Sequence, residues 1–590
     1  MDLWKLKEKM RKMKKVKLFG FLGWIILIAV AFIAWNKNIS PNYEQYEVKK
    51  PDIHIPPNVR PLIVLRGSDY EMGYQNYQQI AEILHPYVLK KFQRSFTKEE
   101  LEVLKIYEKI IQKEAPEMIE YMRGMADGAT DAGIKLSYNE VLAGFVGTRK
   151  IENAETYFEP DCSGWAAWGT ATTDGQLIVT GCGDHGLYSR CRDEVTLLVY
   201  PETGNNYICT TSCGGWHPGM NNKGLGYAHH GGGYCGMHGS HPRKPPQTFY
   251  GLGNSITTPH TLRFANNADE AKDIIIGFSS TSRGLWADVD GNNWDIECNE
   301  DPKVRKAGDC GERDFLYATN NALIEELVQE DETYIPHLGQ WGCPASISSV
   351  ARNSEMWNML HNYHGKVDIE FAKMMWRFPS TEPKGYSSIE EAEELYDETL
   401  GQGWDHHIAN LSNSAPSIGI PDDGNEGLFY VAQGPLIRFS NPQSPGNRHV
   451  HINPTHNFYE VKLAETLEKA VEAAGERAHY DLYYANRELS KLTWSDVAYA
   501  PLREILNQAV EGWLRGNFYM EQASKTEGNE SVLNLGRAIR GYNSSQAYAR
   551  QVFQALVPPP AKPSDLGLRE YMGSWGEWII HPHKEPYRKK

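Results

Sequence analysis

The sequence of 590 residues lacks the short motifs that mark several common enzyme classes. It has no G-x-x-x-x-G-K-[ST] loop, no H-E-x-x-H motif and no G-x-S-x-G elbow, so P-loop, zincin and α/β-hydrolase chemistry are not indicated. The stretch DVDGNN (288–293) has no glycine at the sixth position and no terminal glutamate, both of which a calcium loop requires, and it is typical of a hairpin turn. The histidines of residues 217–241 are separated by glycines rather than by ligand spacings. The sequence therefore predicts no metal and no cofactor.

Excess positive charge is confined to the amino terminus. The net charge is −15, and residues 1–17 carry +6, which leaves −21 on the rest of the chain. So acidic a body argues against nucleic acid as a partner, because both carry negative charge. The basic segment precedes 18 residues without a charge, Leu18–Trp35. This run predicts a transmembrane anchor whose basic flank stays cytoplasmic.

The apolar segment has a second interpretation. Ala29-Val30-Ala31 has the small-x-small form of a signal-peptidase site, which would give a secreted protein. The apolar run continues to Trp35, which favours a retained single-pass anchor. Both interpretations predict an extracytoplasmic body, where disulfides can form.

Cysteine is absent before residue 162 and after residue 343, although nine cysteines lie between these limits. An odd number leaves at least one cysteine outside any intramolecular bridge. If Cys162 is that one, the other eight could form up to four disulfides. The alternative is a mixture of buried thiols with one or two bridges.

The periodicity of apolar residues predicts strands in the middle of the chain and helices at both ends. Strands are expected at 164–173, 176–181, 194–200, 206–211 and 281–297, and amphipathic helices dominate after residue 457. This distribution indicates the α+β class rather than alternating βαβ units. The expected organisation is a flank (1–17), an anchor (18–35), a linker (36–60), a small chain (61–161), a catalytic core (162–450) and a helical region (451–590).

One cysteine stands where a nucleophile could act. The stretch DCSGWAAWGTATTDGQLIVTGCGD (161–184) predicts a hairpin that begins at Cys162, turns at Asp174-Gly175 and ends at Asp184. A residue that becomes an amino terminus can use its own α-amine as the base, and nearby donors must then stabilise the oxyanion. The alternative is a structural cysteine that is buried or disulfide-bonded.

This hairpin resembles the nucleophile hairpin of cysteine N-terminal-nucleophile (Ntn) hydrolases of the acyl-CoA:isopenicillin N acyltransferase type, whose relatives include penicillin V acylase and bile salt hydrolase. The matching residues are Cys162, Ser163, Asp174-Gly175, Gly181 and Asp184, whereas Cys182 stands where that family has an asparagine. Five further segments resemble family landmarks in the same order, namely residues 65–82, 121–133, 219–228, 286–297 and 315–323. Residues after about 345 show no resemblance.

The resemblance implies a four-layer αββα Ntn sandwich and self-cleavage between Asp161 and Cys162, with Ser163 assisting. It further implies that Asp184 positions the new amine and that Asn320 donates to the oxyanion. Asn321 is the alternative donor, and His229 and Arg190 are candidates for contacting the oxyanion or the substrate. Each has a structural alternative, since Asp184 could close a turn, Asn320 could cap a helix and Ser163 could be an ordinary strand residue.

The function implied by the resemblance is that of a membrane-anchored zymogen whose two chains stay associated after the cut. It would cleave a linear carbon–nitrogen amide through a thioester on Cys162 and pass the acyl group to water or to an amine. One alternative is a phospholipase B-like lipid acyl hydrolase. Another is a non-catalytic cell-surface binding protein that kept the fold.

Overall fold

The computed structural model divides the chain into two units, Met1–His54 and Ile55–Lys590. All described residues belong to the second unit. They are residues 61–83, 93–147, 161–184, 195–211, 218–230, 251–278, 283–298, 302–319, 323–324, 356–377, 417–432, 437–439, 450–452, 458–491 and 500–556. The predicted flank, anchor and linker (1–60) lie outside them.

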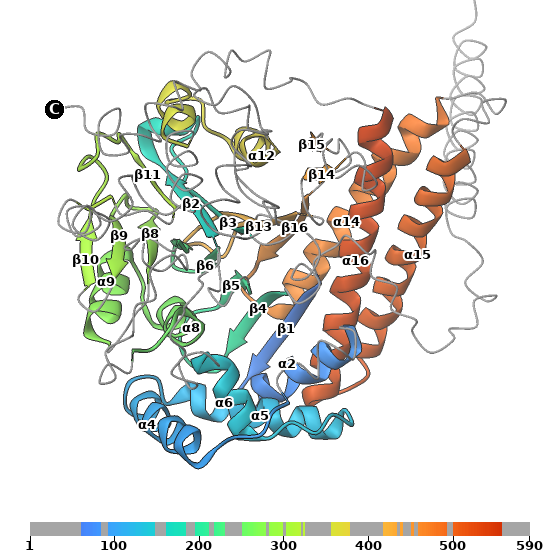
Figure 1. Ribbon diagram of the computed structural model, residues 1–590. Helices are drawn as coiled ribbons and strands as arrows, with labels where there is room; N and C mark the ends of the chain where they lie inside the picture. The colour runs from blue at the N-terminus through green and yellow to red at the C-terminus, as the bar shows by residue number, and fades with distance from the viewer. Residues whose placement is uncertain are drawn as a thin grey trace, which may run out of the picture. The chain divides into compact units, whose positions relative to one another are not determined.

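Strands dominate the middle of the chain, and the long helices lie near its ends (Figure 1). The strands are β1 (Leu62–Gly67), β2 (Asp161–Ala167), β3 (Ile178–Asp184), β4 (Thr196–Pro201), β5 (Tyr207–Thr210), β6 (Gly219–Asn221), β7 (Leu225–Ala228), β8 (Gly284–Asp288), β9 (Asn293–Cys298), β10 (Pro302–Arg305), β11 (Phe315–Ala318), β12 (Ser417–Ile420), β13 (Gly427–Ala432), β14 (Ile437–Phe439), β15 (Val450–Ile452) and β16 (Phe458–Leu463). The helices are α2 (Asp69–Ile83), α4 (Lys98–Glu114), α5 (Glu117–Asp131), α6 (Tyr138–Val146), the 3-10 turn η3 (Gly169–Ala171), α8 (Asn254–Phe264), α9 (Ala268–Gly277), α12 (Ile369–Arg377), α14 (Leu467–Ser490), α15 (Ala500–Ala523) and α16 (Gly528–Leu556). The predicted α+β class is confirmed.

Two large sheets organise these elements. The eight-stranded sheet has the order β1-β4-β5-β6-β7-β8-β9-β10, and the six-stranded sheet has the order β11-β2-β3-β12-β13-β16. The edge strand β1 pairs with β4 in parallel, whereas the other pairs in both sheets are antiparallel. The helical region begins at Leu467, because β16 still belongs to the six-stranded sheet.

The two sheets pack face to face. One buried cluster joins Ala166 and Val179 of the six-stranded sheet to Ala228 and Leu285 of the eight-stranded sheet. The small side chains of Ala166 and Ala228 allow a close approach between the sheets. The side chains of β1 alternate between the two faces of its sheet. Leu62 and Val64 belong to a cluster between the two sheets, whereas Ile63 and Leu65 belong to the core between this sheet and its helices.

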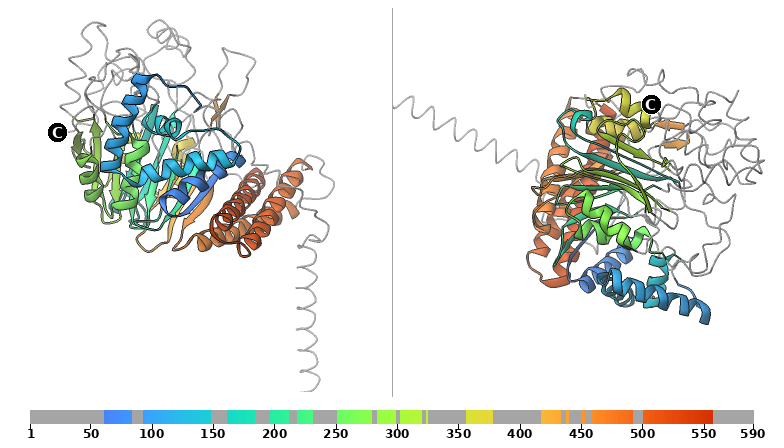
Figure 2. Two further views of the ribbon diagram at one scale, coloured as in Figure 1. Left: turned by 90° about the horizontal axis from the view of Figure 1, so that it is seen from below. Right: turned by 90° about the vertical axis from the view of Figure 1, so that its left-hand side faces the viewer.

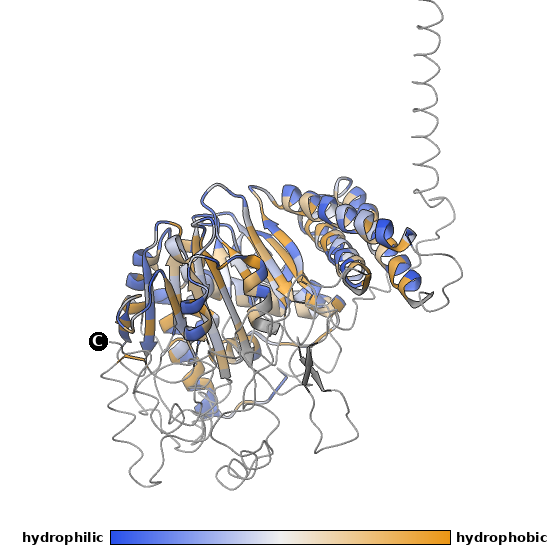
Figure 3. Cartoon of the chain, turned by 90° about the horizontal axis from the view of Figure 1, so that it is seen from above, coloured by the Kyte–Doolittle hydropathy of each residue, from blue (hydrophilic) through white to orange (hydrophobic). Residues whose placement is uncertain are grey.

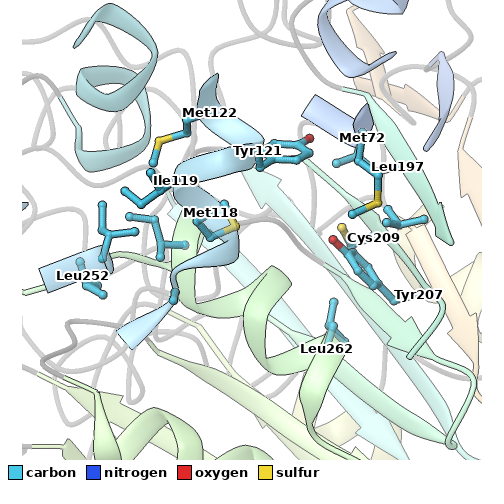
Figure 4. Packing of buried hydrophobic residues seen from close by; sticks show 14 of the residues in the cluster. Met72, Met118, Ile119, Tyr121, Met122, Leu197, Tyr207, Cys209, Leu252 and Leu262 are labelled. Carbon is cyan, nitrogen blue, oxygen red and sulfur yellow. The ribbon is translucent and has the colours of Figure 1, made fainter. Parts of the chain in front are cut away.

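Helices cover the outer face of the eight-stranded sheet. Figure 4 shows this core, in which Met118 and Tyr121 of α5 lie near Leu197 and Tyr207 of the sheet. Two of these helices begin with capping boxes. The hydroxyls of Thr97 (α4) and Ser137 (α6) each accept the backbone N–H three residues later, and the glutamate there accepts the N–H of the cap.

The outer face of the six-stranded sheet is covered by α12 and the helical residues 356–362. These helical residues share a buried cluster with Trp165, Phe315 and Tyr317 of the sheet. Helices α14, α15 and α16 lie beside the sheets (Figure 2), and hydrophobic and hydrophilic residues alternate along them (Figure 3). Helix α14 packs on β16, and α16 packs on both β1 and β16.

Helices α2 and α5 are in contact through glycines. A Cβ atom on Gly124 of α5 would overlap the carbonyl oxygen of Tyr70, and one on Gly128 would lie 2.6 Å from the oxygen of Tyr74. Gly73 of α2 faces the backbone of Tyr121 in the same way. The two amino-terminal landmarks of the resemblance, residues 65–82 and 121–133, therefore form one helix pair.

We expect Gly124→Ala to destabilise the protein by about 1–3 kcal/mol, because the new methyl group must push two helix backbones apart. Gly277→Ala is the matched control, since a Cβ atom at this helical glycine has no heavy atom within 4 Å. The free energy of unfolding by urea measures both effects. Equal stability of the two variants would contradict the close packing of α2 on α5.

Among the helices that the structure describes, none combines the length and the apolarity needed to cross a bilayer. The predicted anchor at 18–35 lies outside that part of the chain.

Candidate active site

The predicted hairpin forms the centre of the six-stranded sheet. Strands β2 and β3 are antiparallel, and their register pairs Cys162 with Gly183 and Asp161 with Asp184. The connection is longer than predicted, because β2 ends at Ala167 and a 3-10 turn precedes the Asp174-Gly175 bend. Gly175 has a φ of +83°, which favours glycine.

Cys162 faces the space between the two sheets. Side chains alternate along a strand, and Ala166, four residues after Cys162, belongs to the inter-sheet cluster, whereas Trp165 packs in the outer core. The Cys162 side chain is fully buried. The thiol therefore belongs to the inward-facing row of β2 that also contains Gly164 and Ala166.

Ser163 lies on the opposite face of β2. Its register partner is Cys182, which packs in the outer core with Trp165, and Ser163 is itself buried. The hydroxyl that was expected to assist self-cleavage therefore faces away from the Cys162 side chain.

Four described cysteines are buried thiols: Cys162, Cys182, Cys209 and Cys310. Five of the nine remain, which is enough for two disulfides at most. The expectation of up to four bridges is therefore wrong, because three cysteines besides Cys162 are also buried as thiols in apolar clusters.

The register between β11 and β2 bears on the predicted oxyanion donor. Ala318 pairs with Gly164 at the end of β11, and Thr319 after it is buried. Asn320 and Asn321 lie outside the described residues, as does Arg190, and the side chains of Asp161 and Asp184 are also outside the description.

The two adjacent histidines after β7 point to different sides of the eight-stranded sheet. His229 lies within hydrogen-bonding distance of Asn254 in α8 (2.7 Å) and of the carbonyl oxygen of Arg283 (3.2 Å), through its Nδ1 atom. His230 instead reaches Asp295 on β9, with 2.6 Å between Nε2 and Oδ1. His229, which was expected to contact the oxyanion or the substrate, thus lies on the helix side, and its neighbour lies on the inner side.

His230 belongs to a buried network of charged groups. Asp295 accepts a hydrogen bond from Nε of Arg305 at 2.6 Å. Arg305 also pairs with Glu312 through Nη1 and donates from Nη2 to the carbonyl oxygen of Tyr317 at 2.6 Å. His230, Asp295, Arg305 and Glu312 are all buried. The network therefore links β9 and β10 of one sheet to β11 of the other.

The network changes the ionisation of its members. Burial alone would raise the pKa of Asp295, but His230 and Arg305 together hold the pKa of this carboxyl below its usual value. Burial lowers the pKa of the Arg305 guanidinium, yet Asp295 and Glu312 raise it well above its usual value. Asp295 and Arg305 are therefore an ion pair in the folded protein.

Glu297 is a second buried carboxyl beside this network. It accepts the backbone N–H of Leu323 at 2.8 Å and that of Ile324 at 3.2 Å. Burial first, and the charge of Asp295 second, raise the pKa of Glu297 from 4.5 to about 8, against the opposing effects of Arg305 and the two backbone bonds. Glu297 thus fixes the chain immediately after the segment 320–322.

This raised pKa makes stability depend on pH. The folded protein binds a proton at Glu297 that the unfolded chain releases above pH 4.5, so this stability is fully present below pH 4.5 and is lost as the pH rises through about 8. We expect Glu297→Gln to gain stability relative to the wild type between pH 5 and pH 9, because the amide stays neutral. Urea unfolding across this range is the measurement, and parallel curves for the two proteins would contradict the prediction.

No sequence motif identifies the network of His230, Asp295 and Arg305. The available signal was the strand NWDIEC of β9, in which charged residues alternate with apolar ones although the strand is buried on both faces. Within the part of the chain that the structure describes, no group of three or more His, Cys, Asp or Glu side chains could hold a metal ion.

No protein-family model matches the chain. An uncharacterized protein of Archaeoglobus fulgidus is 26% identical over 251 residues. The match covers 37% of this chain and 39% of the archaeal protein, so the chain spans about two fifths of the length of that relative.

Proposed function

We propose that the chain is an extracytoplasmic Ntn hydrolase, anchored by residues 18–35, that cuts itself before Cys162 and then cleaves linear amides through a thioester on that residue. The observation that carries this proposal is the register of β2 and β3. It pairs Asp161 with Asp184 across the strands at the bond to be cut, while Cys162 is buried as the second residue of β2, an inner strand of the six-stranded sheet.

The layer order supports the four-layer sandwich that this proposal requires. Helices cover the outer face of the eight-stranded sheet, the two sheets face one another, and α12 with residues 356–362 covers the other outer face. Cys162 faces the interior between the sheets, where a water-poor surrounding strengthens the hydrogen bonds that stabilise an oxyanion.

Self-cleavage begins when the Cys162 thiol attacks the carbonyl carbon of Asp161. The carbon–nitrogen bond breaks, a thioester forms, and water then hydrolyses it to leave the carboxylate of Asp161 and the free α-amine of Cys162. This amine is the base for later turnovers. Asp184 lies opposite Asp161 in the register, which supports its role in holding the amine.

During turnover, Cys162 takes the acyl group of an amide substrate and Asn320 donates to the oxyanion. The last described pair of β11 and β2 is Ala318 with Gly164. Asn320 follows Ala318 by two residues, and Cys162 precedes Gly164 by two. In sequence, Asn320 is thus as far from the last described pair as Cys162 is, which supports Asn320 over Asn321 as the proposed donor.

We expect the two chains to stay together after the cut. Strand β1 of the small chain pairs with β4 along its whole length, and its residues Leu62–Val64 are fully buried. Arg263 of the large chain pairs with Asp69. The small and large fragments should therefore coelute in native size-exclusion chromatography and separate only in denaturant. Separation of the two fragments in native buffer would contradict the pairing of β1 in the small chain with β4 in the large chain.

The proposed reaction is tested with N-acyl amides and lysophospholipids of matched acyl chain. Amide hydrolysis by the wild type, with a mass increase of one acyl group on the chain that begins at Cys162, is the expected result. Hydrolysis of the lysophospholipids alone would favour a lipid acyl hydrolase. Failure to hydrolyse either class by a correctly cut protein would favour a binding role for the fold.

A further inference from the structure

Strand β7 of the eight-stranded sheet crosses β2 close to Cys162. A Cβ atom on Gly164 would lie 2.8 Å from Cβ of Ala228 and 3.3 Å from the carbonyl oxygen of His229. Gly226, earlier in β7, faces Val179, the register partner of Ala166. As β7 advances from Gly226 through Ala228 toward His230, it therefore follows β2 from Ala166 through Gly164 toward Cys162.

His230 thus lies at the same end of the inter-sheet core as Cys162. Each is two residues beyond the contact between Gly164 and Ala228, a distance of about 6.6 Å along a strand. Each is also on the inner side of its own sheet, since His230 reaches the inward carboxylate of Asp295. The two residues therefore lie at the same end of the space between the sheets, each on the inner side of its own sheet.

The hydrogen bond to Asp295 determines which nitrogen of the His230 ring carries the proton. Nε2 lies 2.6 Å from Asp295 Oδ1, and Asp295 is ionised by its pairing with Arg305. A carboxylate acceptor places the ring proton on Nε2, so Nδ1 is the basic nitrogen. In hydrolases that use a nucleophile, a histidine and an acid, the carboxylate also holds one ring nitrogen and leaves the other as the base, but there it holds Nδ1 and Nε2 is the base.

Self-cleavage requires a base other than the α-amine that is proposed to serve in substrate turnover. The α-amine of Cys162 is the base in the mature enzyme, but in the uncut chain this nitrogen is part of the peptide bond and is not basic. The thiol nevertheless has to lose its proton in order to attack, and the departing nitrogen has to gain one. A single group that takes and returns one proton would satisfy both needs.

We propose that His230, oriented by Asp295, is the proton carrier for self-cleavage. Nδ1 takes the proton of the Cys162 thiol as sulfur bonds to the carbonyl carbon of Asp161. When the carbon–nitrogen bond breaks, the same proton passes to the nitrogen of Cys162, which leaves as the amine, and water then hydrolyses the thioester. The inference rests on the proposed function, because it assigns a step in the same cut.

The test follows the cut in the full chain during a cell-free pulse–chase resolved on a denaturing gel. His230→Gln and Asp295→Asn should each slow the cut by about 100-fold or more, the usual contribution of a general base. His260→Gln is the matched control. His260 pairs with Glu117 at 2.6 Å, as His230 pairs with Asp295, but in the helix layer, and its loss should leave the rate unchanged.

A second experiment separates proton transfer from folding. Replacing the residues before Cys162 with a specific protease site allows an added protease to expose the Cys162 amine. His230→Gln cut in this way should hydrolyse amides within a few-fold of the wild type cut in the same way. An inactive product would overturn the assignment of His230 to self-cleavage.

The outcomes distinguish this inference from the proposed function. A wild-type chain that is not cut before Cys162 contradicts the function itself. A wild type that is cut normally, with His230→Gln cut at the same rate, contradicts only the role of His230. Slow cutting with retained activity after protease treatment supports both.

Discussion

Replacing Cys162 by alanine is expected to leave the chain uncut and to lower amide hydrolysis by roughly 10⁴-fold or more. The thiol makes both bonds in the proposed mechanism, first to the carbonyl of Asp161 and later to the substrate. A methyl group can make neither bond. Denaturing gels and hydrolysis assays measure the two effects on the same preparation.

Cys209→Ala is the control for loss of a buried thiol. Cys209 is as buried as Cys162 but packs on the helix side of the eight-stranded sheet. This variant should be cut and active, with only a modest loss of stability from the smaller side chain. A cut chain in Cys162→Ala would show that another nucleophile, or a contaminating protease, performs the cleavage.

Replacing Arg305 by methionine is expected to destabilise the protein by about 3–5 kcal/mol, because Asp295 and Glu312 would remain as buried charges without their partner. The carbonyl oxygen of Tyr317 would also lose the hydrogen bond that Arg305 donates to it. Chemical denaturation of the purified full chain gives the free energy. Arg305→Lys should recover part of the loss. Its single ammonium group can pair with one carboxylate, but it cannot donate to Asp295 and Glu312 from separate nitrogens as the guanidinium does.

Arg123→Met provides the comparison for an exposed ion pair. Arg123 and Glu120 lie 2.7 Å apart on α5, and about half of each side chain is exposed. This variant should change stability by at most about 1 kcal/mol. Similar losses for Arg305→Met and Arg123→Met would show that the network carries no buried charge.

The local order of residues in the hairpin of β2 and β3 is sufficient to predict its two strands and their pairing. Strand alternation and the Asp-Gly turn are properties of neighbours in sequence. The connection was predicted too short. Contacts from distant residues hold it open, since Thr173 N–H donates to the oxygen of Val367 and Trp168 N–H donates to that of Asp314.

The buried network could not be predicted in the same way. His230 and Asp295 are 65 residues apart, and only the neighbouring positions of β7, β8 and β9 bring them together. The sequence around His230 is rich in glycine, which is typical of a loop rather than of a strand. Which of two adjacent histidines faces inward depends on the register of β7, which no local pattern specifies.

The strands after residue 400 complete the six-stranded sheet, although this region showed no resemblance to the family. The hairpin of β12 and β13 has a recognisable turn, PDDGNEG, in which Asp422 accepts the N–H groups of Gly424 and Glu426 and Asn425 has a φ of +63°. Its pairing with β3 is long-range, however, and joins Ser417 to Gly181. The local sequence therefore indicates the hairpin of β12 and β13, but it does not indicate that this hairpin lies beside β3.

The central claim is that the chain cuts itself between Asp161 and Cys162. Intact-mass analysis and amino-terminal sequencing of the purified full chain, expressed without added protease, test it most directly. The proposed function predicts a large fragment whose first residue is Cys162 and a small fragment that ends at Asp161. A single uncut chain, or a cut at any other bond, would contradict it.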